Sequence, residues 1–386
     1  MVEPIATENT LINGSRVAYG VYGKGEPVVL VHGTPSSSLI WRNIVPRLVD
    51  AGYKAHVFDL LGFGLSERPW NTAVDTSMTG QVPVLEGLLE LWGLDKTHIV
   101  AHDIGGGVAQ RFSVFSPERV LSLTLIDVVS FDSYPSKRTK EQMQNGLESL
   151  IKADSDKHRA HFEDWLLSAV KTPAKLKESS LDTYLDYISG PIGQPSLFEH
   201  QVRHYDPKHT LEVVPRLGEL GKLPVQLIWG ADDAWQVVGW AHRLHDAIPG
   251  SSLTILDDTG HFSPEEQPGK ISKTLIGFLK SLLMIEPWEN LTLTCHLLQQ
   301  PSKVIDLTIT PTFNHRHGPQ PQEIRLGRDR STSEGLCHVD PFDASVADFD
   351  DVETDTEALG GIERDLAIGL ETEALGAGRD TLPDID

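Results

Sequence analysis

Asp103 stands between a short apolar run and three glycines, in residues 99–107, which read IVAHDIGGG. An apolar strand, a small residue, a candidate nucleophile between two variable residues, and another small residue before a helix are typical of a nucleophile elbow. Asp103 occupies the place where such elbows usually have a serine. A carboxylate suits this place, because the amino end of the following helix favours an anion. Taken alone, Asp103 could equally be an ordinary helix N-cap.

Candidate partners of Asp103 follow two later apolar runs. Residues 227–233, LIWGADD, end in two adjacent acids, and residues 259–262, TGHF, contain His261. Both places are predicted carboxyl ends of strands, where catalytic groups gather in open α/β sheets. This position favours His261 among the 16 histidines of the chain. Of the two acids we prefer Asp233, because Asp232 suits a turn or a cap.

Two further motifs concern the oxyanion hole and the binding of a cofactor. Residues 32–35, HGTP, follow an apolar run at the place where a second backbone N–H of an oxyanion hole is expected. In residues 59–66, DLLGFGLS, the glycines indicate a turn, since Glu67 replaces the third glycine of a dinucleotide fingerprint. With no phosphate-binding loop and only two cysteines, the sequence predicts neither a cofactor nor a thiolate metal site.

The motifs HGTP, DLLGFGLSE, AHDIGG, WGADD and TGHF, in this order and spacing, resemble the α/β-hydrolase superfamily over residues 10–284. The resemblance is to the aspartate-nucleophile branch, which contains epoxide hydrolases and haloalkane dehalogenases. It implies a hydrolase that works through a covalent aspartyl ester. Asp103 would be the nucleophile, His261 the base, Asp233 its orienting acid, and the backbone N–H groups of Thr34 and Ile104 the oxyanion hole. It also implies a cis peptide before Pro35.

The resemblance does not determine which leaving group Asp103 would displace. Haloalkane dehalogenases hold halide with a tryptophan after the nucleophile and an asparagine or second tryptophan, but here these places hold Ile104 and Thr34. Epoxide hydrolases use cap tyrosines as donors to the developing alkoxide, and the candidates here are Tyr184, Tyr187 and Tyr205. Such tyrosines could also simply pack the lid. An epoxide is therefore slightly favoured over a haloalkane or haloacid. The alternatives are another reaction on a specialised metabolite and a ligand-binding protein without catalysis.

The alternation of short apolar runs with helical periods predicts the α/β-hydrolase fold, with a mostly parallel sheet flanked by helices. The predicted strands are residues 28–31, 55–58, 98–101, 121–126, 225–229 and 253–256. The alternation stops between residues 130 and 220, where amphipathic helical periods predict an inserted helical cap. The predicted core is therefore divided into residues 1–129 and 221–285.

Composition excludes several classes of protein. The 386 residues include 33 basic and 55 acidic side chains, a net charge of −22, which argues against nucleic-acid binding and electrostatic membrane anchoring. No apolar run is long enough for a membrane span, and the amino-terminal residues lack the pattern of a secretory signal. We therefore expect a cytoplasmic protein that acts on a small-molecule substrate. The oligomeric state is left open.

The carboxyl-terminal quarter has a different composition. Residues 286–339 contain proline-rich and polar stretches that indicate an irregular linker. Residues 340–386 carry ten Asp and five Glu against two Arg, with few large apolar side chains. Such a segment cannot bury enough surface to offset the entropy of ordering, so we predict a disordered acidic tail.

Overall fold

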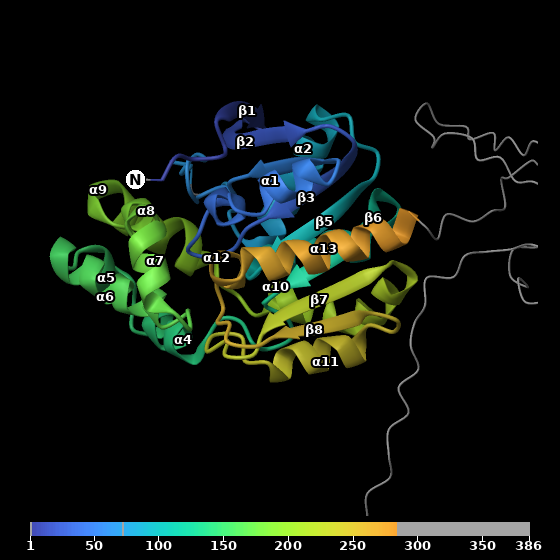
Figure 1. The fold of residues 1–386 in the computed structure, drawn as a ribbon. Helices are drawn as coiled ribbons and strands as arrows, with labels where there is room; N and C mark the ends of the chain where they lie inside the picture. Colours follow the sequence, from blue (N-terminus) through green and yellow to red (C-terminus); the bar gives the residue numbers. More distant parts are fainter. Residues whose placement is uncertain (1, 72, 284–386) are drawn as a thin grey trace, which may run out of the picture. The chain divides into compact units, whose positions relative to one another are not determined.

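The computed structural model describes residues 2–71 and 73–283 and contains one eight-stranded sheet (Figure 1). The strand order is β1-β2-β4-β3-β5-β6-β7-β8, and the six strands from β3 to β8 run parallel. The strands are β1 (Glu8–Ile12), β2 (Ser15–Gly23), β3 (Glu26–Val31), β4 (Tyr53–Phe58), β5 (Thr97–His102), β6 (Val120–Ile126), β7 (Val225–Gly230) and β8 (Ser252–Leu256). The predicted mostly parallel sheet flanked by helices is confirmed.

The two strands that the sequence analysis did not predict form an antiparallel edge. β1 and β2 pair through a hairpin in which Asn13 and Gly14 both have positive φ angles, 51° and 83°. β2 in turn pairs antiparallel with β4. Most side chains of β1 are exposed, and the buried side chains of β2 are interrupted by exposed and half-buried ones. The two strands therefore contain none of the continuous apolar runs by which the six parallel strands were recognised.

Helices bury both faces of the sheet. On β3, Val29 and Val31 pack in one apolar cluster with helices α2 (Met78–Leu91), α3 (Ile104–Phe115) and α11 (Gly239–Ala247). Val28 and Leu30 pack in a second cluster with α1 (Val45–Asp50) and α13 (Pro268–Leu283), the long helix that crosses the sheet in Figure 1. Because successive residues of a strand face opposite sides, this double covering requires the apolar runs seen in the sequence.

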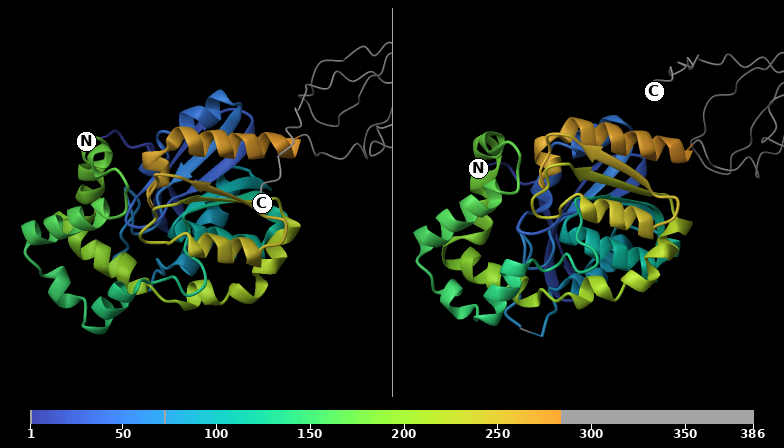
Figure 2. Two further views of the ribbon diagram at one scale, coloured as in Figure 1. Left: turned by 60° about the horizontal axis from the view of Figure 1, so that its bottom comes forward. Right: turned by 90° about the horizontal axis from the view of Figure 1, so that it is seen from below.

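Residues 127–224, between β6 and β7, contain helices and no strand in the structure; we call them the insertion. Figure 2 shows α4 to α9 gathered at one end of the sheet in both views. The helices are α4 (Lys137–Gln144), α5 (Glu148–Ile151), α6 (Ser155–Leu167), α7 (Pro173–Ser179), α8 (Leu181–Ile188), α9 (Gly190–Ser196), the π-helix η3 (Leu197–Gln201), η4 (Val202–His204), α10 (Lys208–Leu211) and η5 (Val214–Lys222). The cap boundaries at 130 and 220 stay predictions.

A buried polar cluster joins the insertion to the core. Arg42, which ends the short helix η1 (Ser38–Trp41), makes two hydrogen bonds to the carboxylate of Glu265 in α12 (Ser263–Glu266). Tyr184 of α8 donates a hydrogen bond of 2.5 Å to the same carboxylate. Since the pairing satisfies both charges away from water, the cluster fixes α8 against the core.

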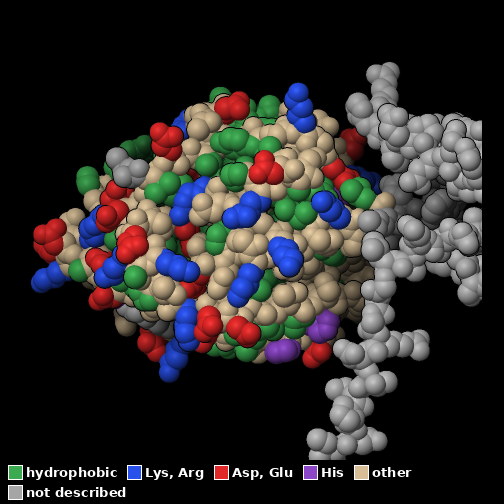
Figure 3. Space-filling model, in the orientation of Figure 1, with side chains coloured by type: hydrophobic (Ala, Val, Ile, Leu, Met, Phe, Trp, Pro, Cys, Tyr) green, Lys and Arg blue, Asp and Glu red, His purple; other side chains and the backbone are tan. Residues whose placement is uncertain are grey.

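The surface and the chain ends bear on the remaining predictions. On the face shown in Figure 3, basic side chains are spread over the middle, and acidic side chains lie mainly toward the edges. No helix within the described residues is long and apolar enough to cross a bilayer. The cytoplasmic location stays a prediction, and the predicted linker (286–339) and acidic tail (340–386) lie outside the described residues.

Gly105 gives a test of the packing of α3 on the sheet. A Cβ atom at this position would overlap the backbone carbonyl oxygens of His32 and Val31. Gly105→Ala should therefore lower the free energy of unfolding by about 3 kcal/mol, measured by urea denaturation. The matched control is Gly277→Ala in α13, where a Cβ meets no heavy atom and should stabilise the helix by about 0.5 to 1 kcal/mol. Equal effects of the two substitutions would contradict this packing.

Candidate active site

Asp103 lies in a strained turn between β5 and α3. Its backbone angles, φ 51° and ψ −123°, are unusual for a residue with a side chain, and such strain persists only where the surrounding structure enforces it. The chain packs closely here, because a Cβ on Gly33 would overlap the Asp103 side chain. Asp103 is 4% exposed, so the turn holds its carboxylate at the carboxyl end of β5, in a nearly dry environment.

Three groups face the Asp103 carboxylate. The backbone N–H of Thr34 donates to Oδ1 at 2.7 Å, and the N–H of Ile104 also donates to the carboxylate. His261 Nε2 lies 3.4 Å from Oδ2. Burial raises the pKa of Asp103, but the hydrogen-bonding and charge of His261, with the Ile104 amide, outweigh it and lower the pKa. The carboxylate is therefore ionised at neutral pH, and the structure brings together the two amides predicted for an oxyanion hole.

His261 is fully buried between two carboxylates. Its Nδ1 lies 2.8 Å from Oδ2 of Asp233, whose Oδ1 accepts the backbone N–H groups of Trp235 and Gln236 at 2.8 Å each. Burial lowers the pKa of His261, but the charges of Asp233 and Asp103 raise it well above its usual value. Asp232 instead pairs with Lys171 at 2.7 Å. The structure thus places Asp233, the preferred acid, against the imidazole.

Asp127, which the sequence analysis missed, braces this pair. It follows β6 directly and is fully buried. One of its oxygens accepts the Gly230 N–H at 2.7 Å, and the other is hydrogen-bonded to Ser263. Burial and the charge of Asp233 raise the pKa of Asp127 well above its usual value. Its place at the carboxyl end of a strand is the sequence signal that could have identified it.

His102 is a second buried neighbour. Its Nε2 donates to the backbone carbonyl of His261 at 2.9 Å. Burial and the charge of His261 lower the pKa of His102 to about 3, so its ring stays neutral. The structure therefore gives His102 a positioning contact to the segment that carries His261.

A cavity of about 200 Å³ opens beside Asp103. Aromatic and aliphatic side chains form most of its wall, and one polar edge comes from the start of α4. The wall consists of Thr34, Asp103, Val129, Ser133, Tyr134, Pro135, Ser136, Thr139, Gln142, His161, Phe162, Trp165, Leu197, Phe198, Val202, Tyr205, Ala234, Trp235 and Gln236. No lysine or arginine is among these residues.

Of the three tyrosines predicted as donors, only Tyr205 lines this cavity. The prediction for the other two is wrong, because their polar groups are used elsewhere. Tyr184 donates to Glu265 in the cluster that anchors α8, and the Tyr187 hydroxyl is hydrogen-bonded to Ser37. Helical spacing placed these tyrosines in the insertion but could not show which of them turns toward Asp103.

Tyr134, which the sequence analysis did not name, also lines the cavity. The Tyr205 hydroxyl lies 2.6 Å from Thr34 Oγ1, which donates to Gln201, so Tyr205 is already engaged as the donor to Thr34. Tyr134, 5% exposed with its ring 5.0 Å from that of Tyr205, makes no hydrogen bond to another described residue. Burial, with Tyr205 and Asp103 nearby, raises its pKa well above the usual value. It therefore offers a protonated hydroxyl to the cavity.

Comparisons with known proteins identify the family of the chain. The model of the α/β hydrolase fold family matches residues 26–268. The cis-3-alkyl-4-alkyloxetan-2-one decarboxylase of Shewanella oneidensis is 35% identical over 274 residues, covering 67% of this chain and 83% of the relative. The 2-hydroxy-6-oxononadienedioate/2-hydroxy-6-oxononatrienedioate hydrolase of Klebsiella pneumoniae is 26% identical, covering 66% and 87%. A crystal structure of an α/β hydrolase fold protein from Burkholderia ambifaria superposes with a TM-score of 0.63 at 27% identity, covering 70% and 97%.

The charge coupling between Asp103 and His261 can be measured directly. Because the negative charge of Asp103 raises the pKa of His261, Asp103→Asn should lower that pKa, followed by NMR titration of ¹⁵N-labelled histidine. The matched control is Asp232→Asn, which removes a carboxylate that pairs with Lys171 and should leave the pKa of His261 unchanged. A pKa that stays constant or rises in Asp103→Asn would show that the two groups are not coupled as the geometry indicates.

Proposed function

The chain belongs to the α/β-hydrolase fold family and is a hydrolase, and from this premise we propose that Asp103 opens a strained oxygen ring, in the first place an epoxide, on a neutral apolar substrate. One observation carries the proposal. The buried carboxylate has one oxygen on a backbone N–H and the other 3.4 Å from the imidazole of His261. A carboxylate so placed can attack a carbon atom and form an ester. The groups around it can then help water to hydrolyse that ester and restore the carboxylate.

In the first step the ionised carboxylate needs no base. Oδ2 of Asp103 forms a bond to an sp³ ring carbon while the carbon–oxygen bond of the ring breaks. The electron pair stays on the ring oxygen, which becomes an alkoxide. Tyr134 donates a hydrogen bond to this oxygen, and its raised pKa ensures that the proton is present. The product of the step is an alkyl ester of Asp103.

In the second step water attacks the carbonyl carbon of the ester. His261, oriented by Asp233, takes the proton of the water, and the N–H groups of Thr34 and Ile104 stabilise the oxyanion on the former carboxylate. General base catalysis of this kind contributes about 10²- to 10⁴-fold, and one oxyanion donor about 10²- to 10³-fold. Cleavage of the ester returns the Asp103 carboxylate and releases a diol, whose two oxygens receive the two protons of the attacking water, one of them passed to the leaving oxygen by His261.

The charge of the cavity supports a neutral substrate. Its described wall has the Asp103 carboxylate and no lysine or arginine, so a dianion would be repelled and would find no cation. This disfavours the dienedioates named for the Klebsiella pneumoniae relative. The aromatic wall, with Phe162, Phe198 and Trp165, suits an alkyl or aryl substituent.

The donors around the cavity favour oxygen over halide as the leaving atom. The two places at which haloalkane dehalogenases have halide ligands hold Ile104 and Thr34. The indole N–H of Trp235 is directed to Ser168 Oγ at 3.3 Å. A hydroxyl donor such as Tyr134 suits an alkoxide, which needs a proton, whereas halide leaves without one.

The relative from Shewanella oneidensis supports a second candidate substrate, an oxetan-2-one, which is a four-membered cyclic ester. Attack of Asp103 on the sp³ carbon that bears the ring oxygen would release that oxygen as a carboxylate. Loss of CO₂ from the neighbouring carbon would then form a carbon–carbon double bond and expel Asp103. This route consumes no water, so it needs neither His261 as a base nor the oxyanion hole in its second step.

The variant His261→Gln separates these routes. With an epoxide panel it should accumulate the Asp103 ester, seen as a mass increase on the peptide that contains Asp103, because the base of the second step is missing. With a cis-3,4-dialkyl oxetan-2-one it should continue to release CO₂ and alkene. Asp103→Asn is the control and should show neither mass gain nor product. If His261→Gln gains no mass on any epoxide and the native chain forms no diol, the epoxide proposal is wrong.

Tyr134→Phe tests the donor to the leaving oxygen. Loss of the hydroxyl should lower kcat for an epoxide by about 10²- to 10³-fold, because the alkoxide loses its hydrogen bond. An oxetan-2-one should be affected little, since a carboxylate leaves without an acid. The matched control is Tyr187→Phe, whose hydroxyl lies outside the cavity and which should retain kcat. Equal rates for Tyr134→Phe and the native chain on epoxides would remove Tyr134 from the mechanism.

A further inference from the structure

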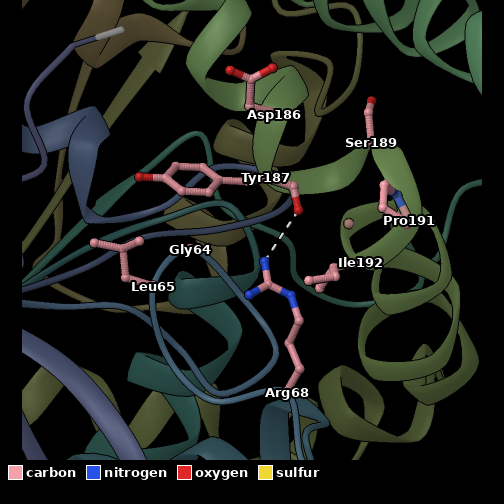
Figure 4. A pocket seen from close by; sticks show the side chains of 9 residues that line it. Gly64, Leu65, Arg68, Asp186, Tyr187, Ser189, Pro191 and Ile192 are labelled. Atoms are coloured by element: carbon pink, nitrogen blue, oxygen red, sulfur yellow. Dashed lines mark hydrogen bonds between the residues drawn. The ribbon is translucent and has the colours of Figure 1, made fainter.

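A second crevice, with a volume of about 280 Å³, lies where the segment after β4 meets α8 and α9 of the insertion (Figure 4). It shares no lining residue with the cavity beside Asp103. Its wall consists of Gly64, Leu65, Arg68, Asp186, Tyr187, Ser189, Pro191, Ile192 and Gly193. The reaction proposed for Asp103 uses none of these residues.

The guanidinium of Arg68 is the one cation of this wall, and it is poorly compensated. Nη2 donates to the backbone carbonyl of Tyr187 at 3.2 Å, while Nε is buried without a hydrogen-bond partner. Burial lowers the pKa of Arg68, which means that its charge is partly desolvated. A desolvated cation is costly unless an anion accompanies it.

The nearby carboxylates do not supply that anion. Asp186 lines the crevice, but Figure 4 shows its carboxylate turned away from Arg68, and Oδ1 pairs with Arg159 at 2.8 Å. The charge of Asp59 acts on Arg68, but its two oxygens accept the backbone N–H groups of Ser38 and Leu65 at 2.7 Å each. No described residue accepts a hydrogen bond from Nη1 of Arg68, so this nitrogen of the guanidinium remains available to a ligand.

We propose that the crevice binds a small monocarboxylate with a short apolar chain. A carboxylate can accept a charge-assisted hydrogen bond from Nη1 of Arg68. The side chains of Leu65 and Ile192, 37% and 69% exposed, and the ring of Pro191 would contact the apolar chain. A phosphate is disfavoured, because Asp186 would repel a second negative charge and the rim offers apolar contacts. The bound acid would add a contact between the core and the insertion, beside the Arg68–Tyr187 hydrogen bond.

The test is a titration of the full chain with hexanoate, followed by ligand-observed NMR and calorimetry, and it needs no turnover. Hexanoate should bind with a Kd of about 1 mM. Hexan-1-ol and inorganic phosphate should each bind at least about tenfold more weakly. Arg68→Met should weaken hexanoate binding at least about tenfold, whereas Arg203→Met, which removes an exposed arginine paired with Glu199, should not.

Ile192→Asp keeps the proposal testable if Arg68→Met disturbs the fold. Ile192 is exposed, so this variant should melt like the native chain, yet its new charge at the rim should abolish hexanoate binding. The proposal is overturned if hexanoate shows no binding up to about 10 mM, or if phosphate binds as tightly. Unchanged binding in a folded Arg68→Met or Ile192→Asp chain would also overturn it. Because no substrate is used, failure here leaves the proposal for Asp103 untouched.

Discussion

The molecule is organised around a carboxylate that is ionised although it is almost completely removed from water. Removing Asp103 from solvent would by itself favour the neutral acid, which could not attack a carbon atom. Two backbone amides and one imidazole reverse that tendency, and each comes from a different segment: the loop after β3, the first turn of α3, and the loop after β8. The sheet order makes β3 and β5 neighbours, whereas the loop after β8 reaches Asp103 across the ends of β6 and β7. The strained backbone at Asp103 is the geometric cost of bringing the carboxylate to the point where the three segments meet.

Burial of the site also limits how many charged groups it can contain, because a charge removed from water is costly. Three carboxyl groups, those of Asp103, Asp127 and Asp233, surround a single imidazole. Asp103 is held ionised by its donors, whereas burial and its neighbour raise the pKa of Asp127 well above its usual value. Asp127 accepts the Gly230 N–H and is hydrogen-bonded to Ser263, so it braces the loops of Asp233 and His261, and its raised pKa disfavours a further negative charge there. Structural bracing and catalytic charge are thus assigned to different acids in one buried cluster.

The sequence predicts the position of a residue well where neighbouring residues determine it, and poorly where contacts between distant segments determine it. The six parallel strands are recognisable in the sequence as apolar runs, because both of their faces are buried. β1 and β2 lie at an edge of the sheet, and their apolar residues are interrupted by exposed ones. The elbow, the two amides and the two partners of Asp103 belong to turns directly after strands, so their positions follow from the sheet. The tyrosines belong to the insertion, whose helices are oriented by contacts such as that of Tyr184 with Glu265. Spacing along a helix cannot show which way such a helix faces. Tyr134 lies in the irregular segment between β6 and α4, where no periodic pattern pointed to it.

Thr34 couples the insertion to the chemistry of the core. Its backbone N–H holds Asp103, while its hydroxyl lies between Tyr205 and Gln201, both of the insertion. A shift of the insertion away from the core would break these side-chain contacts, free the hydroxyl of Tyr205, and loosen the loop that carries an oxyanion donor. The donor set offered to a leaving oxygen and the geometry around the nucleophile therefore change together. The wall of the cavity contains Thr34 of the core together with Trp165, Phe198 and Tyr205 of the insertion, so a ligand that fills the cavity contacts both parts at once.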